Sequence, residues 1–496
     1  MLYHPAEELL KKFAAEQGEK AALLCEGRSI SYTELYTTVR NYAGLLMSDT
    51  LQAGDRVLIA LQDSPEFVCA FLGCIQAGLV PVPCSDLLDQ ERLELLLHDC
   101  RATALFGCSN ASASSAVSPY LKCRYLVDSP QWIEHLSTVQ PCSHPQPVSD
   151  DAVCFILYTS GSTGAPKPVP HRARMLLPET DRLAGLLNIT ADDLLFSVSK
   201  MHFGFGLLNS ILHGLGTGAT VLLLPGKPTI SSLRQIITES RPTLLFAVPA
   251  VYRLLLGEAE TLFQKSRLRL CVSSGEALEQ DLLIDWQKRT GVEIIDSVGV
   301  SETFHPFIAG RPGYAVPPGA AGMVIPPWQA RIVDATGAGL PDGISGFLEV
   351  RDGSGNPCTG TDGQNDTGSW LRTGDIFVAS DNLFTFVGRA DDMFKCDGNW
   401  ASPLPIESAL RAHPAVEECA VRARRILSAY RPEAHIVLKP GWSASTELER
   451  DLFTFIRSRL PAQLCPVQFL FHTELPKTGT GKIRRNMLES TVLERQ

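Results

Sequence analysis

Several features that would assign a protein to a common class are missing from this sequence. No apolar run approaches the roughly 18 residues of a membrane span, and Met1–Glu8 lacks the basic and apolar regions of a signal peptide. There is also no excess of positive charge, because the net charge is −10 and the pI is near 5.6. This charge argues against a nucleic-acid partner held by electrostatics. We expect a cytoplasmic protein with no nucleic-acid and no membrane partner.

Cysteines in metal-binding order are missing as well. The 14 cysteines are scattered without a CxxC pair, which gives a zinc site little support. Several, among them Cys69, Cys74 and Cys154, lie within apolar runs, as buried thiols do. The pattern predicts reduced, mostly buried cysteines in preference to a disulfide scaffold.

The length and the order of apolar runs indicate the fold class. A chain of 496 residues exceeds one ordinary core, so we expect at least two domains. A strand at 56–61, a helix at 65–77 and a strand at 79–83 follow the βαβ order of a parallel sheet. The segment 109–149 is polar and weakly periodic, which predicts a loop-rich surface stretch. A helix at 231–239 lies among further predicted strands, at 194–198, 219–224, 244–248 and 268–272.

The last third of the chain changes character twice. Glycines, prolines and short strands between 313 and 387 suggest a β-rich subdomain. Helix and strand alternation returns near Asp392 for roughly a hundred residues, the size of a small domain. The expected fold class is α/β, with a large N-terminal domain of two α/β subdomains plus a β-rich subdomain, residues 1–390. A small, mobile α+β C-terminal domain, residues 391–496, follows it.

One short loop is the most informative stretch. Tyr158–Lys167 reads Tyr-Thr-Ser-Gly-Ser-Thr-Gly-Ala-Pro-Lys and follows the apolar run 152–157, a predicted buried strand. Glycines let the backbone approach closely, N–H and hydroxyl groups can hold phosphate oxygens, and lysine adds a positive charge. The spacing is not that of a Walker A loop, so a phosphate loop and a flexible surface loop both stay open. The candidate phosphate ligands are Thr159, Ser160, Gly161, Ser162, Thr163, Gly164 and Lys167.

This loop resembles the core motif of the adenylate-forming superfamily, which comprises acyl-CoA synthetases, peptide-synthetase adenylation domains and luciferases. The resemblance implies that the loop binds the β- and γ-phosphates of ATP, with Thr163 and Lys167 among the catalytic residues. The family usually continues with Gly-Val, whereas Pro168 and Pro170 stand here and remove two N–H donors. Further motifs of the family follow in order, so that the resemblance runs from about Ile30 to Leu488.

The stretch Lys200–Asn209 alternates aromatic residues with glycines. A flat ligand could lie against Phe203 or Phe205, although a glycine-rich helix start under core aromatics explains the pattern equally well. The stretch resembles the acid-binding motif of benzoate- and anthranilate-CoA ligases, which implies that His202, Phe203 and Phe205 contact the acid. Amino-acid-activating relatives carry Asp where Gly204 stands, and without it the ammonium group would be buried unpaired. An aromatic acid is therefore favoured over an amino acid.

Two predicted turns at strand ends resemble nucleotide-binding motifs. Ser273–Ala277 is similar to the family's adenine-side loop, although a helix N-cap explains it about as well. In Asp296–Thr303, Glu302 resembles the residue that binds Mg²⁺ beside the triphosphate. Mg²⁺ usually takes one or two carboxylates together with phosphates and water. The nucleotide contacts implied here are Gly275, Glu276, Asp296, Ser301 and Glu302.

The second of these turns also resembles the benzoate branch in its acid contacts. Benzoate-type ligases have an aliphatic residue where Val298 stands, while many other members have an aromatic that stacks on adenine. His305 follows Glu302 by three residues, as in that branch, where the histidine faces the aryl acid. By its spacing alone, His305 is more often a structural residue. The resemblance implies acid contacts from Gly299 and His305.

The remaining motifs complete the nucleotide site and the thiol channel. Trp370–Asp375 resembles the motif whose aspartate binds both ribose hydroxyls, and a carboxylate can accept two O–H donors. Gly388–Pro403 resembles the hinge segment, in which Arg389 contacts ribose and phosphate. The stretch that begins at Gly398 resembles the loop that lines the pantetheine channel of aryl-CoA ligases. The hinge and CoA residues implied are Asp391, Lys395, Gly398 and Trp400.

Pro476–Arg485 is a basic Gly/Thr loop that, without the resemblance, is a solvated tail. It resembles the last motif of the family, whose lysine, here Lys482, reaches into the active site during adenylation. The acid's carboxylate attacks the α-phosphate and pyrophosphate leaves, so the catalysis is largely positioning and charge neutralisation.

The sequence thus predicts an AMP-forming acid–thiol ligase that uses ATP, Mg²⁺ and CoA. A carboxylic acid, preferably benzoate-like, forms an acyl-adenylate, and after a domain rotation about Asp391 a thiol takes the acyl group. The chain ends 14 residues after Lys482, so we expect the thiol to come from CoA or a separate carrier protein. Loading of an aryl or short aliphatic acid onto such a carrier is the alternative. A non-catalytic relative is disfavoured because Lys482, Glu302, Asp375 and Lys167 are all present. We expect a monomer or a homodimer.

Overall fold

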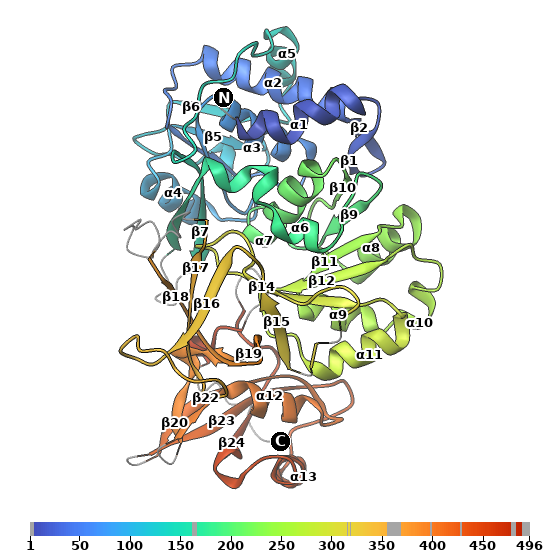
Figure 1. The fold of residues 1–496 in the computed structure, drawn as a ribbon, viewed down its shortest axis with the longest axis vertical. Coiled ribbons are helices and arrows are strands. Elements are labelled where there is room, and N and C mark those ends of the chain that lie inside the picture. Colours follow the sequence, from blue (N-terminus) through green and yellow to red (C-terminus); the bar gives the residue numbers. More distant parts are fainter. Residues whose placement is uncertain are drawn as a thin grey trace. The chain divides into compact units, whose positions relative to one another are not determined.

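The computed structural model describes residues 4–160, 166–314, 316–317, 319–354, 369–396, 399–426, 429–477 and 483–488. The chain forms two compact units. The larger unit comprises Met1–Pro317, Gly322–Gln329 and Arg351–Ser369, and the smaller one Pro318–Ala321, Ala330–Val350 and Trp370–Gln496. Figure 1 shows helices packed against strands in each unit.

One layer of the larger unit is a four-stranded parallel sheet in the order β4-β3-β5-β6. Its strands are β3 (Arg56–Ile59), β4 (Val80–Pro83), β5 (Ala104–Gly107) and β6 (Cys123–Leu126). The nearby helices are α1 (Pro5–Glu16), α2 (Tyr32–Ser48), α3 (Pro65–Gln76) and α4 (Gln90–Asp99). Because β3 and β4 flank α3 in the chain and pair in parallel, the predicted βαβ unit is confirmed.

Polar residues determine where these helices begin. Ser31 and Glu34 form a capping box at the start of α2. Ser64 accepts a hydrogen bond from the Phe67 N–H at the start of α3, and Asp89 caps α4 in the same way. Each cap satisfies N–H groups that the helix itself leaves free.

The strands in the order β14-β13-β12-β11-β9-β10-β1-β2 belong to a second sheet, which continues beyond β14 into β15 (Ala320–Val324). From β13 to β1 every pairing is parallel. The strands are β1 (Ala21–Cys25), β2 (Arg28–Ser31), β9 (Leu194–Ser197), β10 (Thr220–Leu223), β11 (Leu244–Ala247), β12 (Leu270–Ser274), β13 (Ile294–Val298) and β14 (Ile308–Ala309). The helices of this part are α6 (Arg182–Leu186), α7 (Gly204–Leu207), α8 (Ile230–Gln235), α9 (Pro249–Leu256), α10 (Ala259–Leu262) and α11 (Gln280–Thr290). Strands β11 and β12 are buried along their whole length, as parallel strands with covered faces are.

Two helical segments depart from regular α-geometry. The chain continues from α7 into the π-helix η4 (Leu208–Leu215), and from α8 into the π-helical turn η5 (Ile236–Ser240). The helix predicted at 231–239 is therefore present, but its second half is wound more loosely. Such turns are rare and frequently lie at functional sites.

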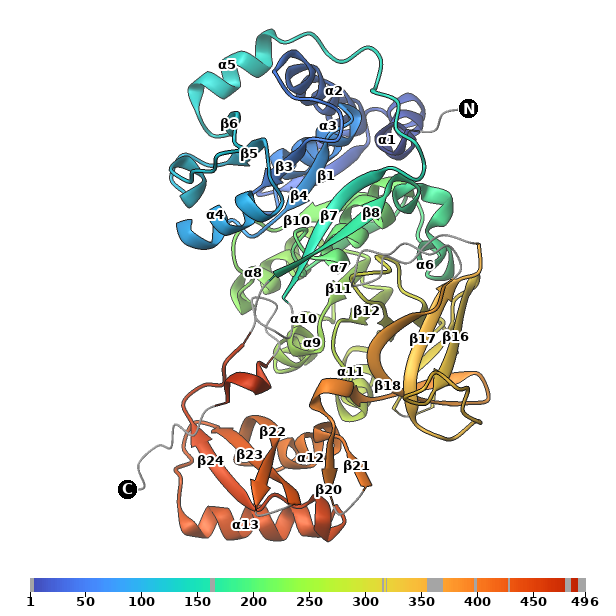
Figure 2. The ribbon, with the colours of Figure 1, turned by 90° about the vertical axis from the view of Figure 1, so that its left-hand side faces the viewer.

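A β-hairpin forms a separate two-stranded sheet of β7 (Val153–Ser160) and β8 (Pro166–Arg172), and β7 packs beside β4. Figure 2 shows it as two long strands side by side. Pro168 lies opposite Tyr158 and Pro170 opposite Ile156. The prolines that depart from the family pattern thus lie within β8, in a two-stranded sheet where a missing donor is tolerated.

The prediction of a loop-rich segment at 109–149 is partly wrong. The segment contains β6 and the helix α5 (Pro130–Thr138), which is capped by Ser129. Trp132 is the buried residue of α5, and its ring lies 5.0 Å from that of Tyr42. The helix has nine residues and lies within a polar segment, so its apolar face of Trp132 and the partly buried Leu136 gives only a short pattern, which explains why the sequence did not reveal it.

The stretch predicted to be β-rich carries β15 (Ala320–Val324), β16 (Trp328–Val333), β17 (Gly346–Asp352), β18 (Leu371–Ser380) and β19 (Leu383–Arg389). Beyond it, the smaller unit has an α+β core. Its elements are β20 (Phe394–Cys396), β21 (Asn399–Ala401), α12 (Pro403–Arg411), β22 (Val416–Ile426), β23 (Ala429–Leu438), α13 (Thr446–Arg457) and β24 (Gln468–His472). Strand β23 pairs antiparallel with β22 and parallel with β24. The α/β fold class is confirmed, with a large N-terminal part and a small C-terminal α+β part. Within the described ranges, we find no helix that combines the length and the apolar character needed to cross a membrane.

Candidate active site

Three neighbouring strands place the predicted nucleotide motifs at one edge of the second sheet. Strands β11, β12 and β13 run parallel, so their carboxyl ends meet at the same edge, where α/β proteins bind ligands. The Ser274 hydroxyl donates to the Ser297 carbonyl (2.8 Å), and the Ser297 hydroxyl donates to the Ser273 carbonyl (3.0 Å). These bonds join the loop of Gly275 and Glu276 to the turn that begins at Asp296.

Asp296 is held in an uncharged form at this edge. It receives a hydrogen bond from the Ser297 N–H (3.1 Å), and burial raises the pKa of its carboxyl to about 8. The carboxyl is therefore protonated at pH 7 in the ligand-free protein. A neutral carboxyl adds no repulsion for a polyphosphate and can both donate and accept a hydrogen bond.

The turn after β13 is tightly built around His305. Phe304 adopts a left-handed conformation (φ 57°), and the Thr303 hydroxyl donates to the His305 carbonyl (2.9 Å). The Nε2 of His305 lies 2.8 Å from the Met175 carbonyl, to which it donates. Burial lowers the pKa of His305, so a neutral imidazole stands here. A Cβ added to Gly299 would lie 3.2 Å from the Pro306 Cα, so a larger residue would crowd the turn.

The aromatic residues of the acid motif lie just before α7, at His202 and Phe203, and within it, at Phe205. The His202 and Phe203 rings lie 4.1 Å apart, and burial lowers the pKa of His202 to about 4. The Phe205 ring lies 6.3 Å from that of Phe246 on β11. A Cβ at Gly206 would come within 2.2 Å of the Lys200 carbonyl, so this turn requires glycine. The glycines that the sequence shows among the aromatics thus have a steric reason at Gly206.

Asp63 anchors the start of this motif and was missed by sequence reasoning. It is buried, it accepts a hydrogen bond from the Met201 N–H (3.0 Å), and its Oδ2 lies 3.8 Å from Lys200 Nζ. A single aspartate after a strand carries no pattern that would have identified it.

A group of buried polar side chains beside the acid motif was also missed. His213 on η4 and Asp181 at the start of α6 are both buried, and His213 Nδ1 lies 2.5 Å from Asp181 Oδ2. His171 stacks on Phe155 at 4.6 Å, and burial lowers its pKa to about 3. In the sequence, a histidine directly after the apolar pair Ile211-Leu212 was the one available sign of this group.

Part of the phosphate loop lies outside the described residues, namely Gly161, Ser162, Thr163 and Gly164. The residues on either side of it are paired across the β7–β8 hairpin, since Thr159 lies opposite Lys167. Lys167 is exposed. Of Ser160 only the backbone is described, opposite Pro166. The predicted phosphate loop therefore connects the paired ends of β7 and β8.

In the smaller unit, the predicted ribose and phosphate residues lie together. Asp375 on β18 pairs with Arg389 on β19, and Asp375 Oδ1 lies 2.9 Å from Arg389 Nη1. Gly374 has φ 78°, and a Cβ there would lie 3.2 Å from Arg389 Nη2. The ion pair orients both groups.

The residues predicted for the hinge and for CoA binding come directly after Arg389 in the chain. Asp391 is exposed in the 3₁₀ turn η6 (Ala390–Asp392). Lys395 and Trp400 face each other on β20 and β21, with Lys395 Nζ 5.4 Å from the indole ring. Trp400 is 65% exposed, so it is available to a ligand. Gly398 and Lys482 lie outside the described residues.

A metal site made by protein ligands alone is not found in the part of the chain that the structure describes, where no three His, Cys, Asp or Glu side chains converge. Glu302 is partly exposed in the turn after β13. One carboxylate suits Mg²⁺, which usually completes its shell with phosphate oxygens and water.

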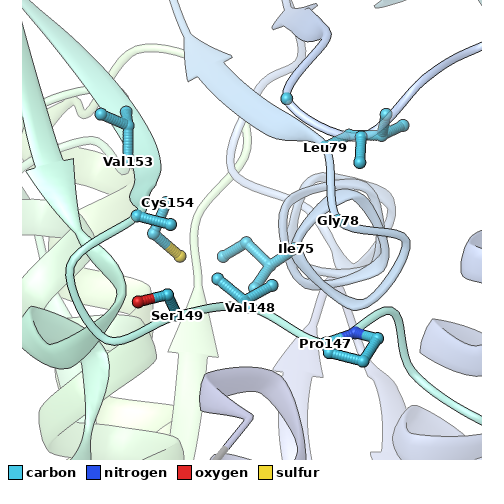
Figure 3. Close-up of a pocket in the computed structure, with 11 residues that line it drawn as sticks. Ile75, Gly78, Leu79, Pro147, Val148, Ser149, Val153 and Cys154 are labelled. Carbon is cyan, nitrogen blue, oxygen red and sulfur yellow. The ribbon is translucent and has the colours of Figure 1, made fainter.

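A separate hollow of the larger unit does not coincide with these residues. It lies between the α3–β4 turn and the start of β7, where Ile75, Leu79, Val148 and Cys154 are among the lining residues (Figure 3). The phosphate loop leaves the other end of β7, roughly 20–25 Å away at about 3.3 Å per residue. The predicted site therefore lies elsewhere than this hollow.

Comparisons with known proteins agree with the motifs. The model of the AMP-binding enzyme family matches residues 10–355, and that of the AMP-binding enzyme C-terminal domain matches residues 405–482. The benzoate–CoA ligase of Thauera aromatica is 33% identical over 515 residues, which cover 98% of this chain and 96% of the relative. The anthranilate–CoA ligase of Pseudomonas aeruginosa is 32% identical, covering 92% of this chain and 91% of the relative.

Solved structures are similar as well. An anthranilate CoA ligase in complex with anthranoyl-AMP superposes with a TM-score of 0.88 at 30% identity, over 98% of this chain and 96% of the other. A benzoate CoA ligase from Burkholderia xenovorans superposes with a TM-score of 0.85 at 28% identity, over 98% of this chain and 99% of the other.

The raised pKa of Asp296 predicts a pH-dependent stability. Between the ordinary value of 3.8 and the folded value of about 8, the unfolded chain loses a proton that the folded chain keeps. Asp296 therefore lowers the stability as the pH rises through this range. Asp296→Asn removes this titration, so the free energy of unfolding of the variant, relative to the wild type, should increase by about 1 kcal/mol per pH unit from pH 5 to pH 8.

Urea unfolding at several pH values measures this difference. The control is Asp285→Asn, which removes an exposed carboxylate of α11. A relative stability of Asp296→Asn that stays constant with pH, or an equal trend in the control, would contradict the assignment.

Proposed function

The chain belongs to the family of AMP-binding enzymes, and from this premise we propose that it is an AMP-forming ligase of an aromatic acid and CoA. The acid, which is benzoate-like, reacts with ATP to give an acyl-adenylate and pyrophosphate. In a second step the thiol of CoA takes the acyl group and AMP leaves. The benzoate- and anthranilate-CoA ligases that match along almost the whole chain support this choice of acid and thiol.

The observation that carries the proposal is the setting of His305. It extends from the turn after β13, close to the carboxyl ends of β11 and β12, and its Nε2 is already engaged by the Met175 carbonyl. Burial keeps the ring uncharged. A neutral, oriented ring beside aromatic residues suits a flat aryl acid, whose face is apolar. The absence of a carboxylate at Gly204 favours the same substrate over an amino acid.

In the first step we assign the nucleotide contacts by motif and by position. The phosphate loop that includes Thr163, together with Lys167, takes the β- and γ-phosphates, and Glu302 holds Mg²⁺ together with phosphate oxygens and water. Gly275, Glu276, Asp296 and Ser301 line the adenine side. Asp375 binds the ribose hydroxyls and Arg389 the ribose and phosphate.

We assign Lys482 to the adenylation step and Asp391 to the change of state between the steps. A lysine that contacts both the acid and the α-phosphate offsets the charge that develops as pyrophosphate leaves. A turn such as η6 can absorb the backbone rotation that lets one site serve two reactions. We place the boundary between the large and small domains here, at residues 390 and 391, and assign Lys395, Gly398 and Trp400 to the thiol channel.

Acid-dependent release of pyrophosphate tests the function directly. The panel contains benzoates, short fatty acids and amino acids, each with and without CoA. We expect release with a benzoate, and a thioester only when CoA is present. Adenylate without thioester would point to a carrier protein as the acceptor. Release with fatty acids alone, or with no acid of the panel, would refute the proposed substrate class.

Lys482→Ala should lower the rate of pyrophosphate release by at least about a hundredfold while ATP still binds, because the lysine acts on the transition state. Stopped-flow pyrophosphate detection and calorimetric ATP titration measure the two properties. Lys477→Ala is the matched control, since Lys477 belongs to the same basic loop but pairs with Glu418 at 2.9 Å. Unchanged adenylation in Lys482→Ala would refute the assigned role.

Asp391→Pro should slow thioester formation by more than about tenfold relative to adenylation, because proline fixes φ at the turn. The two half-reactions are measured separately, as pyrophosphate release without CoA and as acyl transfer from preformed adenylate. Asp391→Ala, which removes the carboxylate but leaves φ free, is the control. Equal losses in both half-reactions of Asp391→Pro would argue against a hinge at this residue.

A further inference from the structure

The buried pair of His213 and Asp181 is more elaborate than a structural contact requires. Asp181 Oδ1 accepts a hydrogen bond from the Ala184 N–H (2.9 Å) and so caps α6, while Oδ2 lies 2.5 Å from His213 Nδ1. Burial raises the pKa of Asp181, but His213, His305 and the Ala184 N–H together more than offset this and hold it below its usual value. The carboxylate is therefore ionised, and it selects the tautomer of His213 with the proton on Nδ1.

In this tautomer, His213 presents an unshared electron pair at Nε2. That atom is buried and finds no hydrogen-bond partner among the described residues. Asn209, four residues earlier on η4, is in the same situation. Its amide Nδ2 lies 3.5 Å from the Ser197 hydroxyl, and its buried Oδ1 has no partner within the described ranges. Folded proteins seldom leave buried acceptors unpaired, so two on one π-helix indicate a missing donor.

These acceptors lie next to the residues assigned to the acid. The His213 ring is 5.9 Å from that of Phe246, which in turn is 6.3 Å from Phe205. Asp181 and His213 also lie near enough to His305 to act on it electrostatically. The polar pair thus lies in the neighbourhood of Phe205 and of His305, both of which we assign to the aryl acid.

We propose that His213, oriented by Asp181, and Asn209 form a polar subsite that accepts a hydrogen bond from a hydroxyl or amino substituent on the ring of the aromatic acid. The inference rests on the proposed function, since it names the substituent of the acid that this site takes. The subsite accepts hydrogen bonds and does not donate them, so the ring substituent must carry a hydrogen atom that it can donate. A fluorine or a methoxy group does not satisfy it.

The wild-type enzyme should therefore prefer aromatic acids whose ring substituent can donate a hydrogen bond. A buried acceptor left unpaired by the wrong substrate weakens binding of the transition state, typically by about tenfold to a hundredfold for one hydrogen bond. We expect one hydroxy- or aminobenzoate to have a kcat/KM that is higher by this factor than the kcat/KM of benzoate. The same acid should exceed, by the same factor, the fluorobenzoate that is substituted at the same ring position. The assay is pyrophosphate release with each acid in turn.

His213→Phe should abolish this preference, because phenylalanine fills a similar volume without an acceptor. Leu215→Met is the matched control. It alters an equally buried position of η4 without changing polarity, and it should keep the wild-type preference.

Asp181→Asn tests the tautomer directly. The Ala184 N–H holds the amide oxygen at the cap, so the amide NH₂ faces His213 Nδ1 and moves the ring proton to Nε2. The subsite then donates a hydrogen bond instead of accepting one. The ratio of kcat/KM for the methoxybenzoate to kcat/KM for the hydroxybenzoate should therefore rise by about tenfold relative to the wild type.

The outcomes separate the two proposals. Benzoates activated with equal kcat/KM for donor and fluoro substituents, or an unchanged preference in folded His213→Phe, would overturn the subsite and leave the proposed function standing. No activation of any aryl acid would overturn both. If His213→Phe does not fold, the wild-type comparison and Asp181→Asn decide the question.

Discussion

The parallel alignment of β11, β12 and β13 is the constraint on which the candidate site depends. Because the strands run in one direction, their carboxyl ends share an edge, and residues far apart in the chain meet there. The serine bonds between Ser273, Ser274 and Ser297 hold two of the loops at a constant spacing. Strand β9 lies beside β11 in the same direction and carries the acid motif to the same sheet. Sheet geometry thus assembles groups that sequence order keeps apart.

Burial then sets the charge of these groups. The same desolvation raises the pKa of Asp296 and lowers those of His202 and His305, because in each case it opposes the charged form. All three become neutral near pH 7. A site that must accept a polyphosphate and an apolar ring gains from neutral hydrogen-bonding groups, since they orient a ligand without adding repulsion or a large desolvation cost.

The elements with long or well-ordered apolar runs were predictable, and a short helix in a polar segment was not. The βαβ unit around α3 follows from the apolar runs at 56–61, 65–77 and 79–83. Helix α5 was not predicted because it has nine residues and packs through Trp132 and the partly buried Leu136. For the site, the order of motifs led to Glu302, His305 and Asp375. Asp63, Asp181 and His213 stayed hidden because each is a single polar residue, and only folding shows that its neighbours bury it.

This difference has a physical origin that bears on specificity. Residues that handle ATP serve a ligand that is common to every reaction of the family, so they recur in fixed motifs. The residues that we propose to select the acid have surroundings whose shape comes from glycines and helix winding. At Gly206 the backbone approaches the Lys200 carbonyl too closely for any side chain, and η4 then presents Asn209 and His213 on loosely wound turns. A pocket built in this way changes its substrate by exchanging single side chains, because a buried acceptor rejects a ring that cannot satisfy it more strongly than an apolar wall rejects a ring of the wrong size.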